Sequence, residues 1–419
     1  MNAANTAREF DDLMRRRALG TVFQPIVRLD GRRTVGYEAL VRGPAGSPLA
    51  SANALLEAAY RADRVVEFDW VARACACRAA LDGQLGPNRL LFLNIEPLAL
   101  GTDCPPDLWP DIERAFGTFK VMLEITERSL GRDPRSLFEG VDRQRPTAAG
   151  LALDDVGPMT TALAMLPVLS ADLIKIDLTV TQASTTAPSL KVLDIAFEEA
   201  ERTGATILAE GIETDDHLRQ ASAFGADLGQ GNYFGEPGPL PPDERDSIVA
   251  SVDSESIVDV ATPFEALVGR PTHRATAEFL RPFSHQVAFG ETDLAEPALV
   301  IQLVPDPDLF GPAERHALTR LAGRGVIAGV LGPGAFDVSV PGVRGAPVHE
   351  SVLDGQWALL ALSPSSAGAM LARAVPGTAE FEFGVTHDRR RVVVAARCLL
   401  RRLGPLPAES PVSGTAGRG

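Results

Sequence analysis

The chain has 419 residues, of which 45% are hydrophobic and 23% are charged, as in an ordinary globular protein of two or three domains. Its formal net charge of −15 argues against binding to nucleic-acid polymers or to anionic membrane surfaces, which require a basic face. If so acidic a protein acts on a phosphate compound, metal ions have to offset its own negative field.

The cysteines and the apolar runs indicate the compartment. Cys75, Cys77, Cys104 and Cys398 form no CxxC motif and have no zinc-site spacing, so we expect reduced thiols. Residues 1–19 lack the apolar segment of a secretory signal. No apolar run approaches the roughly 20 residues that a membrane-spanning helix needs. These features predict a cytoplasmic protein that does not enter a membrane.

The first half of the chain alternates strands with helices. A hairpin over 21–27 and 34–41, turning at Asp30-Gly31, predicts an antiparallel first pair. The later strands are expected at 90–93, 120–123, 150–153, 172–177, 206–209 and near 227–231. Helices are expected at 9–19, 51–81, 106–116, 135–143, 160–169, 188–202 and 215–224. Eight strands with helices between them favour a closed, mainly parallel α/β barrel, with a doubly wound open sheet as the alternative.

An adjacent acid pair, Asp154-Asp155, follows the apolar run 150–153. Two carboxylates at the end of a buried strand repel each other, and a divalent cation would remove that cost. The alternative is a helix N-terminus, where Asp residues cap backbone N–H groups. The pair alone leaves both interpretations open.

Polar residues stand at nearly every strand end, and this favours the metal interpretation. In a barrel these ends converge on one face, where active sites lie. The set is Glu38, Asn94, Glu124, Asp154, Asp155, Lys175, Asp177, Glu210 and Gln230. It offers oxygen ligands for hard divalent cations and contains no histidine. No glycine-rich phosphate loop follows a strand, so ATPase or dehydrogenase chemistry is unsupported.

Residues 21–240 resemble the EAL-domain cyclic-di-GMP phosphodiesterases. The matching motifs, in family order, are Gln24-Pro25-Ile26, Glu38-Ala39-Leu40-Val41-Arg42, Asn94 in LFLN, Glu124-Ile125-Thr126-Glu127, Asp154-Asp155, Lys175-Ile176-Asp177, Ala209-Glu210-Gly211-Ile212-Glu213 and Gln230-Gly231. The resemblance implies a modified TIM (β/α)8 barrel with an antiparallel first strand. It also implies a two-metal Mg²⁺ or Mn²⁺ site, hydrolysis of cyclic di-GMP to linear pGpG, and a homodimer formed through the barrel.

The same resemblance assigns a role to each site residue. The implied metal ligands are Glu38, Asn94, Glu124, Asp154, Asp155 and Glu210. The implied catalytic residues are Lys175, Glu210 and Gln230, which position or deprotonate water. The implied substrate-binding residues are Gln24, Leu40, Arg42, Asp177 and Glu213. Glu127 would hold the loop after Asp155.

This chain departs from the family directly after the acid pair. Where the family has Phe-Gly-Thr-Gly-Tyr-Ser-Ser, residues 156–162 read VGPMTTA, and Asn232 and Glu236 replace the usual aromatic and arginine. The altered loop keeps a second hypothesis open, a receptor that binds cyclic di-GMP without cleaving it. A third is a protein-interaction module that binds no nucleotide. No presumed ligand is missing, so catalysis is the favoured hypothesis.

The second half predicts a smaller α/β sensory domain. The expected boundaries are 1–245 for the barrel, 246–262 for a linker, 263–405 for the second domain and 406–419 for a disordered tail. We expect strands at 298–302, 325–331, 357–362 and 380–385, and helices at 263–268, 272–283, 313–321, 365–374 and 389–403. The segments 262–267 and 384–389, with the Trp357 strand, resemble the DICT sensory domain. That resemblance implies an unidentified small-molecule or protein signal. His387 is either a ligand-binding group or a hydrogen-bonded residue at a strand end.

Overall fold

The computed structural model describes residues 3–87, 89–126, 133–157, 160–183, 186–241, 259–289, 298–333 and 340–406. The chain forms two compact units, one made mainly of residues up to Asp259 and the other mainly of residues from Val260 on. This division falls inside the predicted linker 246–262. Most of that linker and most of the predicted tail lie outside the described residues, so the domain boundaries stay predictions.

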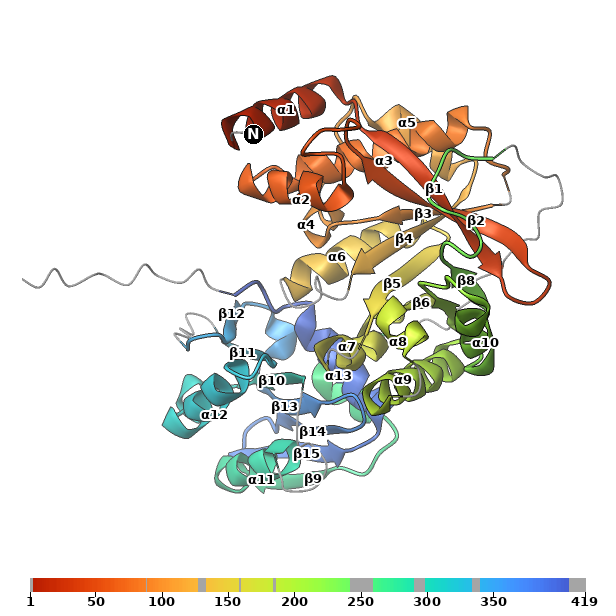
Figure 1. The fold of residues 1–419 in the computed structure, drawn as a ribbon. Coiled ribbons are helices and arrows are strands. Elements are labelled where there is room, and N and C mark those ends of the chain that lie inside the picture. The colour runs from red at the N-terminus through yellow and green to blue at the C-terminus, as the bar shows by residue number, and fades with distance from the viewer. Residues whose placement is uncertain are drawn as a thin grey trace, which may run out of the picture. The chain divides into compact units, whose positions relative to one another are not determined.

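The first unit is a closed eight-stranded barrel (Figure 1), as the alternating pattern predicts. Its strands are β1 (Gly20–Arg28), β2 (Arg33–Arg42), β3 (Leu90–Asn94), β4 (Lys120–Thr126), β5 (Gly150–Val156), β6 (Leu173–Ile176), β7 (Thr206–Ala209) and β8 (Leu228–Gln230). β1 is antiparallel to both of its neighbours, β2 and β8, and the other pairs are parallel. The predicted antiparallel first strand is confirmed, and the open-sheet alternative is wrong.

Helices connect the strands on the outside of the barrel. They are α1 (Ala3–Arg16), α2 (Ala52–Arg61), α3 (Val65–Asp82), α4 (Pro97–Leu100), α5 (Trp109–Phe116), α6 (Pro134–Gln144), α7 (Thr160–Leu169), α8 (Leu178–Gln182), α9 (Ala187–Thr203) and α10 (Asp215–Ala223). The helix expected over 51–81 is two helices, because Asp63 takes a left-handed φ of 53° that an α-helix cannot contain. α9 ends at Gly204, also left-handed, as its sequence predicts.

The interior of the barrel is a packed apolar layer to which every strand contributes. This layer consists of Ile26, Val35, Leu90, Phe92, Met122, Ala152, Leu173, Leu208 and Leu228. Successive side chains on a strand point to opposite faces, so on β3 to β8 the residue two positions beyond each of these also faces inward. The interior layer therefore fixes which polar strand-end residues can meet.

The second unit is a mixed seven-stranded sheet with the order β12-β11-β10-β13-β14-β15-β9. Its strands are β9 (His273–Thr276), β10 (Leu299–Leu303), β11 (Ile327–Pro333), β12 (Arg344–Val348), β13 (Gln356–Leu362), β14 (Ala367–Ala374) and β15 (Glu380–Thr386). Its helices are α11 (Ala277–Phe289), α12 (Pro312–Ala322) and α13 (Arg389–Leu400), with short 3-10 turns η2 (Pro263–Leu267), η3 (Pro307–Leu309) and η4 (Ser351–Leu353). The predicted second α/β domain is confirmed.

The helices of the second unit cover the two faces of its sheet. On one face, Leu280 of α11 packs with Trp357, and Leu318 of α12 packs with Val300. On the other face, Leu403, just after α13, lies where a side chain on Gly329 would stand. Both faces are buried, so β13 is apolar from Trp357 to its end at Leu362.

Two elements of the second unit were predicted wrongly, one throughout and one in part. Residues 365–374 were expected to form a helix, but Ala367–Ala374 is β14, hydrogen-bonded to β13 on one side and β15 on the other. Ala, Met and Leu favour helices, and pairing on both sides of a sheet overrides that weak preference. The helix expected over 272–283 was wrong at its start, because His273–Thr276 is the edge strand β9, paired with β15, and α11 begins only at Ala277. The other edge strand, β12, was not predicted, because a short edge strand carries little hydrophobic alternation.

Three smaller expectations can be compared with the structure. The cysteines are free thiols. No helix among the described residues is long and apolar enough to cross a membrane. The His387 ring nitrogen Nδ1 lies 3.3 Å from the Ala367 carbonyl oxygen, which agrees with the interpretation of His387 as a hydrogen-bonded residue at a strand end. The DICT resemblance itself stays a prediction.

Candidate active site

The polar strand-end residues continue the inward-facing positions of the barrel. Each lies two positions beyond a residue of the interior layer, at the carboxyl end of its strand. They are Asn94 on β3, Glu124 on β4, Asp154 on β5, Lys175 on β6, Glu210 after β7 and Gln230 on β8. The alternation of side chains therefore gathers six predicted site residues at one mouth of the barrel.

Lys175 is the centre of this group. Its side chain is 1% exposed, and its ammonium Nζ lies 2.6 Å from Asp154 Oδ1, 2.9 Å from Glu124 Oε1 and 3.0 Å from Glu210 Oε1. A fourth carboxylate, Glu38 Oε2, lies 3.4 Å away. One buried cation thus links carboxylates from four different strands or strand ends.

Two amide side chains hold Glu38. Asn94 Nδ2 donates to Glu38 Oε1 at 2.8 Å, and Gln230 Nε2 donates to Glu38 Oε2 at 2.7 Å. Gln230 Nε2 also lies 3.0 Å from Gln24 Oε1 on the antiparallel strand β1. The following Gly231 has a φ of 151°, and a Cβ there would stand 2.1 Å from the Ile212 carbonyl oxygen. Only glycine lets the chain leave β8 so closely and keep Gln230 directed at Glu38.

Asp155 reaches the site by an irregular backbone. In a regular strand it would point away from Asp154, because neighbouring side chains alternate. Instead it has a left-handed φ of 58°, and the β5–β6 register shifts between Leu153 and Val156. One carboxylate oxygen from each of Asp154, Asp155 and Glu210 consequently lies within 4.8 Å of the others.

The electrostatics of the site are set by burial and by an excess of acid. Burial, reinforced by neighbouring carboxylates, raises the pKa of Glu124 and of Glu210 well above the usual glutamate value. Burial would also raise the pKa of Glu38, but Lys175 and the two amide donors outweigh it and hold that pKa below its usual value. Burial alone would lower the pKa of Lys175. The four carboxylates raise it by more, so this pKa lies well above the ordinary lysine value.

This donor set fits divalent cations. Four carboxylates, Glu38, Glu124, Asp154 and Glu210, contact one ammonium group, and a fifth, Asp155, lies beside Asp154 and Glu210. The site therefore has more acidic groups than its own lysine can balance. Glu124 is fully buried, yet its Oε2 accepts no hydrogen bond among the described residues. A buried, unpartnered carboxylate oxygen is costly without a cation. All the donors are oxygen atoms, which Mg²⁺ and Mn²⁺ prefer.

A pocket of about 290 Å³ opens beside these carboxylates. Glu38, Asn94, Asp154 and Asp155 line it on the side of the cluster. The rest of the lining is mixed: apolar residues of β2, α2 and α3, including Leu40, stand beside polar residues such as Asp69, Arg73 and Glu96. The site is therefore accessible to a ligand that has both a phosphate-like polar part and an apolar body.

The structure also describes Arg42, Asp177 and Glu213, which were predicted to bind substrate. Arg42 Nη1 donates to the Val41 carbonyl oxygen at 2.9 Å. Asp177 caps α8, where its Oδ1 accepts the Thr179 N–H at 2.8 Å. Glu213 is exposed. Glu127 and residues 158–159 of the altered loop lie outside the described residues. The roles predicted for these residues are not tested by their positions.

A buried ion pair in the wall of this pocket was not predicted. Asp69 and Arg73 of α3 are both 4% exposed, and Arg73 Nε donates to Asp69 Oδ2 at 2.6 Å. The other oxygen, Asp69 Oδ1, accepts the backbone N–H of Glu96 at 2.8 Å, two residues beyond Asn94. The pair therefore holds the loop that leaves β3. The sequence feature that could have indicated this ion pair is an Asp and an Arg four residues apart in a largely apolar helix.

A closed α/β barrel with carboxylates at the carboxyl ends of its strands, beside an open pocket, has the architecture of the TIM-barrel-like enzymes. Residues 7–237 match the family model of the EAL domain, and the chain therefore belongs to the EAL-domain family.

Relatives and solved structures are similar over the same half of the chain. The cyclic di-GMP phosphodiesterase RocR of Pseudomonas aeruginosa is 31% identical over 227 residues, 52% of this chain and 57% of RocR. The probable cyclic di-GMP phosphodiesterase PdeN of Escherichia coli is 27% identical over 56% of this chain and 46% of its own length. A manganese and cyclic-di-GMP complex of Klebsiella pneumoniae BlrP1 is 26% identical over 52% of this chain and 56% of its own, with a TM-score of 0.47. The chain thus spans about half the length of these relatives.

Proposed function

We propose that the barrel unit hydrolyses one phosphodiester bond of cyclic di-GMP and releases linear pGpG. The observation that carries the proposal is the cluster of carboxylates around Lys175 at the barrel mouth, beside an open pocket. Family membership and the names of RocR and PdeN support the substrate. A homodimer through the barrel and regulation by the second unit remain predictions.

The reaction would depend on two divalent ions, Mg²⁺ or Mn²⁺. Glu38, Asn94, Glu124 and Asp154 would hold one ion, and Asp154, Asp155 and Glu210 the other. When bound, such ions polarise phosphate oxygens and lower the pKa of water. Their charge would also offset the negative field of the site, so that an anionic substrate can approach.

The chain's own residues would orient the water and the substrate. Lys175 Nζ, fixed by carboxylates on several sides, would position the attacking water. Glu210 has a raised pKa and lies at the edge of the cluster, so its carboxylate is suited to accept the proton of the attacking water. Arg42, at the end of β2, would contact a substrate phosphate.

The direct test is product analysis. Purified protein incubated with cyclic di-GMP and Mn²⁺ or Mg²⁺ is expected to form pGpG, and a chelator is expected to stop the reaction. Chromatography separates the two nucleotides. Calorimetry on the same samples distinguishes an enzyme from a receptor: tight binding with no product at high protein concentration would favour the receptor hypothesis and contradict ours.

Metal binding is expected to strengthen as pH rises. Because the pKa values of Glu124 and Glu210 are raised in the folded protein, both carboxyl groups bind protons above the usual glutamate range. Without metal, their contribution to stability is full below the unfolded pKa and is lost as pH rises through the raised folded pKa. Glu38, with a lowered pKa, has the opposite sign: its contribution is lost as pH falls below the usual value.

The measurement is the rise in Tm on adding Mn²⁺ at several pH values. Metal has to displace the bound protons, so the rise is expected to be larger at about pH 8 than at about pH 6. Titration calorimetry in two buffers of different ionisation enthalpy should show net proton release on metal binding. An increase in Tm that does not change with pH would contradict the assignment of these carboxylates as ligands.

A further inference from the structure

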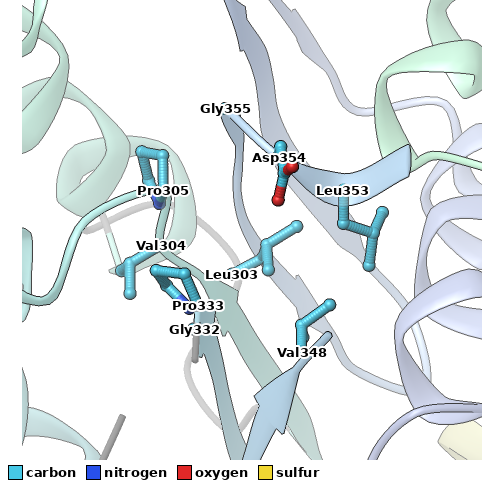
Figure 2. A pocket seen from close by; sticks show the side chains of 9 residues that line it. All are labelled: Leu303, Val304, Pro305, Gly332, Pro333, Val348, Leu353, Asp354 and Gly355. Atoms are coloured by element: carbon cyan, nitrogen blue, oxygen red, sulfur yellow. The ribbon is translucent and has the colours of Figure 1, made fainter. Parts of the chain in front are cut away.

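The second unit contains a pocket of about 230 Å³ at the carboxyl ends of its parallel strands. Leu303 ends β10, Gly332 and Pro333 end β11, and Val348 ends β12. The chain then returns through Leu353, Asp354 and Gly355 to start β13 on the other side of β10. The pocket is bounded by Leu303, Val304, Pro305, Gly332, Pro333, Val348, Leu353, Asp354 and Gly355 (Figure 2).

The topology explains why a cavity forms there. β10, β11 and β12 succeed one another in one direction across the sheet, and β13 reverses that order. The point of reversal in an α/β sheet is where the connections diverge and leave a crevice at the strand ends. β10 stops at Leu303, whereas β11 and β12 remain paired as far as Pro333 and Val348. The overhang of these two strands forms one wall of the pocket.

The side chains that line the pocket are apolar except for one acid, and polar atoms share its exposed surface with them. Leu303 and Leu353 are 2% and 4% exposed and form the buried part of the wall. Pro305 and Pro333 have no N–H group to offer a ligand. Asp354 carries the one ionisable side chain among the lining residues, and Figure 2 shows it directed toward Leu303. Its carboxylate has no hydrogen-bond or ion-pair partner among the described residues, and the residue is exposed to solvent.

The turn that presents this acid is constrained. Asp354 N–H donates to the Ser351 carbonyl oxygen at 3.1 Å, which closes η4. Gly355 follows with a φ of 69°, and a Cβ there would stand 2.9 Å from the Ala374 Cβ. The backbone that carries the carboxylate is therefore fixed between η4 and the first residue of β13. A fixed acid at the mouth of a pocket whose other side chains are uncharged selects for positive charge.

We propose that this pocket binds a small organic cation, a primary amine on an aromatic or branched aliphatic body. The ammonium group would pair with Asp354, and the body would contact Leu303, Val348 and Leu353. An engineered apolar cavity of about 150 Å³ binds benzene, so 230 Å³ accommodates a ring with a short substituent. The acidic net charge of the chain, −15, also favours a cation over an anion.

Three probes of equal size and different charge test the proposal on the full chain. Benzylamine, benzyl alcohol and benzoate are titrated by ligand-observed NMR, with affinities near the millimolar range expected for ligands of this size. We expect benzylamine to bind most tightly and benzoate most weakly. In D354N, benzylamine affinity should fall about fivefold, as for a solvent-exposed ion pair, while benzyl alcohol binding stays unchanged.

Two further variants separate this pocket from other acidic sites on the molecule. D308N removes an exposed acid of η3 that does not line the pocket, and it should leave all three affinities unchanged. V348F places a ring at the pocket wall and should remove binding of benzylamine and benzyl alcohol alike, with Tm measured to confirm folding. The proposal is overturned if benzylamine binds D354N as tightly as the wild type, if benzoate binds best, or if no probe binds at about 10 mM.

Discussion

The variant Lys175→Met is expected to lose about 3–5 kcal/mol of metal-free stability and to lose hydrolysis of cyclic di-GMP. The ammonium group of Lys175 balances carboxylates from β2, β4, β5 and the end of β7 in a buried site. Methionine fills a similar volume without the charge, so Glu124 and Glu210 are left buried and unpaired. Removing one partner of a buried ion pair costs this amount because the remaining charge stays desolvated.

The pH dependence of the loss identifies its cause. The pKa of Lys175 is raised above its usual value, so its contribution to stability is complete at every pH below the ordinary lysine range. Lys175 itself does not titrate in this range, so any change of the deficit with pH comes from the carboxylates. The deficit of Lys175→Met should shrink as pH falls, because the carboxylates then become neutral in the variant. Added Mn²⁺ should also reduce the deficit, since it supplies the missing positive charge.

Thermal unfolding in the absence of metal, across a range of pH, measures this effect. For a unit of this size the predicted loss corresponds to a fall in Tm of about 10 °C. Lys191→Met on α9 is the matched control, because Lys191 is exposed and its replacement should change Tm little. A deficit that is equal at every pH would point to a packing defect in place of an electrostatic one.

Periodicity explains how much of the site the sequence could predict. Once β3 to β8 are recognised, the alternation of side chains places Asn94, Glu124, Asp154, Lys175 and Gln230 on the inside, each two residues beyond an apolar interior residue. The strand ends of a closed parallel barrel then have to meet. Local pattern and one topological rule were sufficient for these residues.

Backbone irregularity and tertiary pairing explain what the sequence could not predict. The direction of Asp155 depends on a left-handed φ and a register shift, which no period-two pattern contains. The link between Asp69 and the loop after β3 joins a helix to a strand end through one backbone N–H. The strand β14 was missed because its helix-favouring residues are held by pairing on both sides. Each case depends on contacts distant in the chain.

The variant Glu124→Gln is expected to separate catalysis from stability. Glu124 lies at the end of β4, fully buried, with one oxygen beside Lys175 and the other unpartnered among the described residues. Glutamine keeps the size of the side chain and removes the charge that a metal requires. Loss of the metal-dependent route is worth several kcal/mol of barrier, so hydrolysis should fall by about a thousandfold or more.

The same substitution should preserve or raise the metal-free Tm near neutral pH. Burial and the nearby Glu38 raise the pKa of Glu124, which means that the folded protein favours the neutral form of this side chain. Glutamine is uncharged at every pH, so it matches the neutral form that the folded protein favours. The raised pKa of Glu124 makes the metal-free stability of the wild type decline as pH rises, and this decline should be smaller in the variant. The increase in Tm produced by Mn²⁺ should become smaller in the variant at the same time.

A matched substitution at the surface completes the comparison. Glu57→Gln on α2 makes the same chemical change at an exposed side chain, and it should leave hydrolysis, Tm and the response to Mn²⁺ unchanged. Lys175→Met and Glu124→Gln then form a pair, since both should lose activity while their metal-free stabilities move in opposite directions. If Glu124→Gln were instead strongly destabilised without metal, Glu124 would be a structural partner of Lys175, and its place in the metal site would be contradicted.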